Sequence, residues 1–282
     1  MRTTFVPMLA ALIGLAAGGA HADDWNRTYR VGAHPHLAVS TDDAHVSVLV
    51  GEPGTIAIRV HTEGWKIGSG GIAIHDEQSG DQVRFETREP HFQWGLTFHP
   101  LKIEVEVTVP RELALDVDTG DGNVTLAPVT GTVRVHTGDG SVDAEGLHGD
   151  LSLVSGDGHI RAHDLDGRLY AHTGDGGIAV SGRFTRLELS SGDGRIEATA
   201  DAGSKVAEVW DLHTGDGSIQ LRVPKDLAAD LEAETGDGSI DADLPVSVEG
   251  RFVSRHLSGH LNGGGAPIRL RSGDGNIHIA AL

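Results

Sequence analysis

The chain has 282 residues and is acidic, with 41 aspartates and glutamates against 22 lysines and arginines and a formal net charge of −19. Nucleic acid and anionic membranes both require a basic face, so this composition argues against either as a partner. The absence of cysteine excludes a disulfide framework, a thiolate metal site and a cysteine nucleophile.

Residues 1–22 have the features of a secretory signal peptide. Arg2 provides a short positive region, an apolar run extends from Phe5 to Ala17, and Ala20-His21-Ala22 has the small-x-small pattern of a cleavage site. The apolar run is shorter than the roughly 20 residues of a membrane-spanning helix. We therefore expect signal cleavage, a periplasmic or secreted mature protein, and no membrane insertion after cleavage.

Residues 23–110 form an irregular first part in which apolar and polar residues alternate. Runs such as His45–Val50, Thr55–Val60 and Leu101–Val109 have the period of two that half-buried strands show. This part therefore predicts β-structure without a strict repeat.

An aromatic-rich insertion lies between Pro90 and Pro100 in a chain that otherwise has few aromatic residues. One interpretation is a loop that covers the side of the fold. The functional hypothesis is a ligand-binding surface, because aromatic side chains in loops can stack on sugar rings or peptide groups. Its residues would be Phe92, Trp94 and Phe98.

Residues 111–282 contain eight copies of Thr/Ser-Gly-Asp-Gly, each followed after one residue by Val or Ile. The first five copies recur at a constant spacing of 18, and the later gaps are 23, 21 and 37. A fixed period of this kind indicates a repeat architecture, and apolar residues on both sides of each copy predict strand, turn and strand. The copies begin at Thr119, Thr137, Ser155, Thr173, Ser191, Thr214, Thr235 and Ser272.

Two all-β architectures fit this unit. In an antiparallel meander, each Gly-Asp pair would be a two-residue hairpin turn. In a right-handed parallel β-solenoid (β-helix), the turn is a corner and one coil takes about 18 residues, each stacked on its equivalent about 4.8 Å away. The constant spacing favours the solenoid, with residues 23–110 as irregular β-coils continuous with the regular repeats of residues 111–282.

The segment from Pro224 to Glu234 has the composition of a helix. Internal alignment contradicts that propensity, because Val223–Leu227 repeats the pattern of Val109–Leu113 ahead of a turn. We therefore predict a strand that enters at Leu231.

The turn residues are predicted to be structural. Glycine permits positive φ, and a turn aspartate can accept backbone N–H bonds. The first glycines are Gly120, Gly138, Gly156, Gly174, Gly192, Gly215, Gly236 and Gly273. A calcium ladder is the less favoured alternative, because stacked carboxylates repel by roughly 1 kcal/mol per pair even in a water-like dielectric. The ligands of such a ladder would include Asp121, Asp139, Asp157, Asp175 and Asp193. We therefore expect no metal and no cofactor.

These features resemble the bacterial family of β-strand-repeat domains of unknown function known as "putative adhesins". The resemblance rests on the signal peptide, the strand that ends Val107–Pro110, the repeated turn motif and the run Leu261–Leu270 before the last turn. It covers roughly residues 23–282. It implies a β-helix-like fold and a location outside the cytoplasm, and it carries over no catalytic residue.

The leading functional prediction is an exported, non-enzymatic protein that presents a binding or adhesion surface at the cell envelope to a glycan or a protein. An envelope-stress or signalling accessory protein with a protein partner is the alternative. A polysaccharide-acting enzyme is less favoured, because the chain has many acidic residues without a matching basic set.

Overall fold

The computed structural model describes residues 22–90, 102–244, 246–247 and 255–282. Every regular element in these ranges is a β-strand, which confirms the all-β prediction. The described residues include no helix of the length and apolarity needed to span a membrane.

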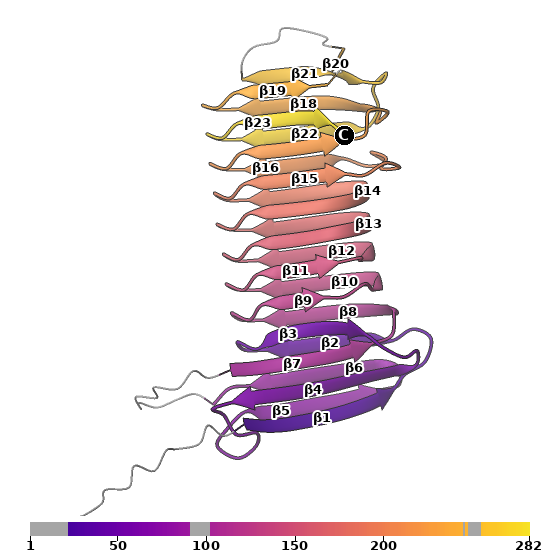
Figure 1. The fold of residues 1–282 in the computed structure, drawn as a ribbon, viewed down its shortest axis with the longest axis vertical. Helices are drawn as coiled ribbons and strands as arrows, with labels where there is room; N and C mark the ends of the chain where they lie inside the picture. The colour runs from indigo at the N-terminus through magenta and orange to yellow at the C-terminus, as the bar shows by residue number, and fades with distance from the viewer. Residues whose placement is uncertain (1–21, 91–101, 245, 248–254) are drawn as a thin grey trace, which may run out of the picture.

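The strands stack into an elongated body whose long axis runs across them (Figure 1). We call the sheet that contains the strands leading into the Gly-Asp-Gly turns the pre-turn sheet, and the sheet that contains the strands leaving them the post-turn sheet. The pre-turn sheet runs, in spatial order, β5 (Ala73–Ser79), β6 (Gln82–Arg88), β2 (His36–Thr41), β8 (Glu112–Thr119), β10 (Thr130–Thr137), β12 (His148–Ser155), β13 (Ile160–Thr173), β14 (Ile178–Ser191), β16 (Trp210–Thr214), β22 (Pro267–Ser272), β18 (Ala229–Thr235), β21 (His256–Leu261) and β20 (Val246–Ser247).

The post-turn sheet lies opposite and shares β13 and β14, which are long enough to belong to both sheets. Inward-pointing residues of the two sheets form one hydrophobic core along the stack. In spatial order the post-turn sheet runs β1 (Ala22–Arg30), β4 (Thr55–Glu63), β7 (Lys102–Val109), β3 (His45–Val50), β9 (Val124–Leu126), β11 (Val142–Glu145), β13, β14, β15 (Ile196–Ala200), β17 (Ile219–Val223), β23 (Ile277–Ala281) and β19 (Ile240–Asp243).

The regular repeats pair in parallel, and each residue pairs with its equivalent in the next copy of the motif. Val133 lies between Leu115 and Leu151 in the pre-turn sheet, and Ile160 pairs with Ile178 in the post-turn sheet. A meander would instead pair the two strands that flank each turn. The strands that flank the first turn have other partners, since β8 pairs with β2 and β10, and β9 pairs with β3 and β11. Each turn is therefore a corner between two sheets.

Both ends of the stack depart from the predicted parallel sheet. The pairs β1–β4, β4–β7 and β5–β6 at one end, and β18–β21 and β20–β21 at the other, are antiparallel. The parallel pairing predicted for the solenoid is therefore present in the regular repeats and absent from these pairs at the ends. A short connection is one physical reason, since only Gly80 and Asp81 separate β5 from β6, and so short a loop can join only antiparallel strands.

The spatial order of the coils also differs from the chain order. The last coil, β22 and β23, lies between the coil of β16 and β17 and that of β18 and β19. Figure 1 shows these yellow strands below the orange β18. At the other end, β2 and β3 pair with β8 and β9, although β4 to β7 come between them in the chain. The irregular gaps after Thr214 thus reflect a chain path that passes one coil position and later returns to fill it.

The structure confirms the strand that internal alignment predicted after Pro224, against the helix propensity of that segment. This strand, β18, begins at Ala229, slightly before the predicted start at Leu231. Burial of Ala229, Leu231 and Ala233 in the core explains why a strand forms despite the helix-favouring composition.

A ladder of buried hydroxyl groups connects the turns. Thr137 Oγ1 donates to the carbonyl oxygen of Gly122 at 2.9 Å, and Ser155 Oγ donates to that of Gly140 at 2.8 Å. Ser155 Oγ also accepts the backbone N–H of Gly158 at 2.9 Å, so its hydrogen bonds are satisfied although the residue is buried. The same donation to the adjacent coil is made by Thr173, Ser191, Thr214, Thr235 and Ser272.

The turn glycines are required for a different reason from the one predicted. None of the eight first glycines has a positive φ. A Cβ atom on Gly156 would lie 2.5 Å from the carbonyl oxygen of Gly138, and one on the second glycine, Gly158, would lie 2.0 Å from that of Gly140. The glycines therefore allow the backbones of neighbouring coils to approach closely.

Candidate functional site

The predicted aromatic surface, Phe92, Trp94 and Phe98, lies outside the described residues. So does most of the predicted signal peptide, which the structure describes only from residue 22. Both remain predictions.

The turn aspartates form an exposed acidic edge. Asp121, Asp139, Asp157, Asp175 and Asp193 are all exposed, and the backbone N–H of Asp157 donates to the carbonyl oxygen of Gly138 at 3.2 Å. In the described part of the chain, no group of three or more histidine, aspartate or glutamate residues is arranged to hold a metal ion.

The outer surface of the pre-turn sheet carries the exposed ring of Tyr170, in β13. Its side chain is 44% exposed, whereas the rings of Phe85, Phe184 and Trp210 are buried. Alternation along the strand explains its position, because Leu169 and Ala171 point into the core and Tyr170 must point outward. It is the one exposed tyrosine, tryptophan or phenylalanine of the described chain. The sequence offered a signal for it, namely a tyrosine at an outward position of a predicted strand.

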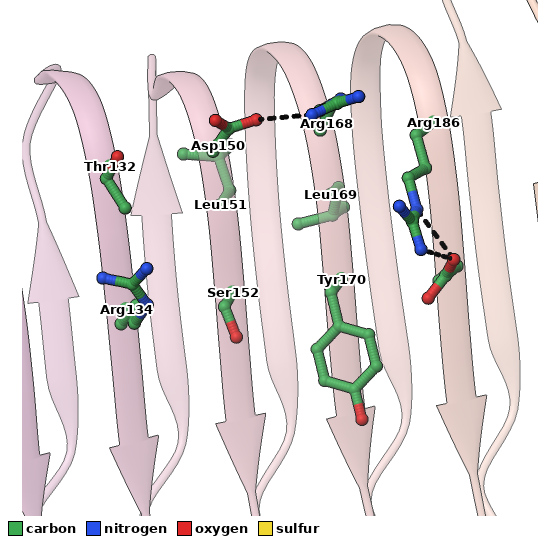
Figure 2. A pocket seen from close by; sticks show the side chains of 10 residues that line it. Thr132, Arg134, Asp150, Leu151, Ser152, Arg168, Leu169, Tyr170 and Arg186 are labelled. Atoms are coloured by element: carbon green, nitrogen blue, oxygen red, sulfur yellow. Dashed lines mark hydrogen bonds and ion pairs between the residues drawn. The ribbon is translucent and has the colours of Figure 1, made fainter. Parts of the chain in front are cut away.

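Tyr170 stands between two shallow hollows in this surface. Its neighbours in register are Ser152 and Glu188, and Figure 2 shows Ser152 as a much shorter side chain beside the ring. The first hollow, of about 330 Å³, extends towards Arg134. The second, of about 460 Å³, extends towards Arg271. Tyr170 and Glu188 line both, so one ring is accessible from either side along the stack.

A charge network borders the ring. Arg186 donates through Nε to Glu188 at 2.7 Å and through a terminal nitrogen to Glu208 at 3.1 Å. Arg168 also donates to Glu208, and its other terminal nitrogen lies 3.8 Å from Asp150. The hydrogen bond from Arg168 is the main cause that lowers the pKa of Glu208, while Glu188 raises the pKa of Arg186. The two guanidinium groups are therefore held in place over the sheet.

Glu208 comes from the loop that joins β15 to β16, where the spacing between turns first lengthens. The extra residues thus place a carboxylate within hydrogen-bonding distance of Arg168 and Arg186. Sequence reasoning missed Glu208, although the longer spacing marks the place where the repeat is interrupted.

We expect Glu208→Gln to change the NMR shifts of the Arg168 and Arg186 guanidinium groups, because both lose a charged acceptor. The free energy of unfolding should change little, since exposed ion pairs are screened by water. A lowered carboxylate pKa stabilises the folded protein above the ordinary value of 4.5, and that contribution is lost as the pH falls through the lowered pKa. The wild-type guanidinium shifts should therefore show a titration step below pH 4.5 that comes from Glu208 and that Glu208→Gln lacks. Identical titrations would contradict this network.

A family model described as Toastrack DUF4097 matches residues 35–280 of the chain. None of the curated proteins compared with the chain matches it.

Several solved structures are similar over most of their length. They include a "putative cell adhesion protein" from Clostridium sporogenes with 13% identity, covering 93% of this chain and 100% of that one at a TM-score of 0.34. A "putative lipid binding protein" from Parabacteroides distasonis has 14% identity, covering 92% and 97% at a TM-score of 0.49. A "putative adhesin" from Bacteroides fragilis has 12% identity, with coverage of 92% and 97% and a TM-score of 0.36. Similarity at this level carries no argument about a ligand.

Proposed function

The chain belongs to the Toastrack DUF4097 family, and from that premise we propose that it is an exported, non-enzymatic protein whose pre-turn sheet binds a partner at the cell envelope. The observation that carries the proposal is the exposure of Tyr170 between two hollows. A large aromatic side chain that is kept out of the core costs hydrophobic stabilisation, and such residues concentrate at binding surfaces.

The carboxylates around Tyr170 support a binding role over catalysis. A general acid works with a pKa raised towards neutrality, as burial can produce. Glu208 has a lowered pKa, and both Glu188 and Glu208 accept hydrogen bonds from Arg186. These groups are arranged to fix one another's orientation, which suits recognition of a partner.

Export is supported by the sequence of residues 1–22, and a periplasmic or secreted location follows from it. We expect the coils to be right-handed, since parallel strands joined by a crossover connection nearly always have that handedness. The parallel pairing of equivalent residues from β8 to β15 is the pattern that such coils require.

The proposal predicts that Tyr170→Ala weakens binding to isolated bacterial cell envelopes by about tenfold, ~1.4 kcal/mol, measured by co-sedimentation. The melting temperature should stay nearly unchanged, because the ring is outside the core. Thr199→Ala, at an outward position of β15 in the post-turn sheet, is the matched control and should bind like the wild type. Equal binding by the Tyr170→Ala protein and the wild type would reject the pre-turn sheet as the binding surface.

A further inference from the structure

We infer that the pre-turn sheet binds an uncharged, linear glycan that lies along the long axis of the stack, across the strands. This inference rests on the proposed function, because it names the class of ligand for the same surface.

The shape of the surface indicates an extended ligand. A third hollow, of about 510 Å³, is lined by residues of β2, β6, β8, β10 and β12, and it shares Arg134 and Ser152 with the first. The first and second hollows share Tyr170 and Glu188. The three hollows therefore follow one another from β6 to β22, a path of about 40 Å at the usual strand spacing. A compact ligand would occupy only part of it.

The side chains along this path repeat at the spacing of the coils. One outward side chain per strand follows the next in register, and the set combines acceptors, donors and an aromatic ring. Carboxylates and guanidinium groups can bond to hydroxyl groups, and a tyrosine ring can stack on the C–H face of a sugar ring. A polymer of similar sugar units would meet such groups at regular intervals. The set is Asp116, Arg134, Ser152, Tyr170, Glu188 and Asp211.

Most charged side chains along the path are paired with an opposite charge, which favours an uncharged ligand. Arg134 lies 3.4 Å from Asp116, and Arg271 lies 3.7 Å from Asp211. Arg168 and Arg186 are paired with Asp150, Glu188 and Glu208. No surplus of positive charge is left among these described residues to attract an anionic glycan, and the net charge of −19 would repel one. Five carboxylates of this surface each lie within 4.0 Å of an arginine, so a basic protein segment would have to displace arginines there; they are Asp116, Asp150, Glu188, Glu208 and Asp211.

The inference is tested by calorimetric titration of the full mature chain with cello-, malto- and N-acetylchito-oligosaccharides of increasing length. Fragments of polygalacturonate serve as the acidic glycan for comparison. We expect one neutral series to bind with an affinity that rises with length beyond the disaccharide, and more tightly than the acidic fragments. Ser190→Trp, which fills the second hollow, should weaken that binding at least tenfold. Ser181→Trp, on the same strand but facing outward from the post-turn sheet, should not.

Tighter binding of the acidic fragments, an affinity independent of length, or no binding by any neutral series would each overturn the inference. If envelope binding then still depended on Tyr170 and were destroyed by protease treatment of the envelopes, the partner would be a protein. In that case the glycan would be wrong and the proposed function would stand. Envelope binding that does not depend on Tyr170 would instead remove the proposed function itself.

Discussion

Removal of residues 267–282 is expected to abolish cooperative folding, although these residues are the end of the chain. They form β22 and β23, which are hydrogen-bonded on both sides, so their loss removes the partner at one edge of four other strands. It also removes four fully buried apolar side chains. At about 1.5–3 kcal/mol each, these are comparable with the 5–15 kcal/mol that stabilises a typical domain. The four are Ile268, Leu270, Ile277 and Ile279.

Thermal unfolding followed by circular dichroism measures this effect. The truncated chain should show no sharp transition, or one many degrees below that of the full chain. Deletion of Leu282 alone is the control, because that residue is 47% exposed and its N–H makes one backbone bond to Val223 at 2.9 Å. A truncated protein with the full-length melting temperature would show that the last coil does not fill the position between β16 and β18.

Replacement of Gly176 by alanine is expected to lower the free energy of unfolding by about 3 kcal/mol or more. The added Cβ would lie 2.0 Å from the carbonyl oxygen of Gly158 and 2.9 Å from Oγ1 of Thr173. Both neighbours belong to the tightly packed turn ladder, so two coils must move apart, and the hydrogen bond from Gly174 N to Gly156 O would be strained or lost.

Gly177 provides the matched control for that substitution. A Cβ there would meet its nearest atom, the carbonyl oxygen of Arg195, at 3.3 Å. The equivalent positions of neighbouring coils hold Asn123, Ser141 and His159, so the turn accepts a side chain at this point. Gly177→Ala should change the free energy of unfolding by no more than about 0.5 kcal/mol in denaturant titrations. Equal losses for Gly176→Ala and Gly177→Ala would refute the close approach of the coils as the reason for the glycines.

The regular part of this fold could be predicted because its physics is local and repeated. A constant spacing that alternates apolar residues around a fixed turn specifies the parallel partners Leu115, Val133 and Leu151 without any other information. The same reasoning placed a strand near Leu231 against its helical propensity. The reason for the turn glycines was predicted wrongly, because φ is a property of one residue whereas the contact is made with another coil.

The order of the coils could not be predicted, because identical copies of a motif do not specify which copies pair with each other. Ser272 stacks on Thr214, whereas Thr235 precedes it in the chain. The surface around Tyr170 was missed for a related reason. Its residues come from several coils and from the loop that contains Glu208. The sequence shows the length of this loop but not its direction, so the pairing of Glu208 with Arg168 could be found only from the structure.

Site-specific photo-crosslinking tests most directly whether the pre-turn sheet is the binding surface. A benzophenone amino acid would replace Tyr170 in one protein and Ala179, an outward position of β14 in the post-turn sheet, in another. Each protein would be irradiated in intact bacterial cells that export it. We predict a crosslinked product from position 170 and none from position 179, with the product shortened by glycosidases. Crosslinking from position 179 alone, or equally from both positions, would contradict a binding surface around Tyr170.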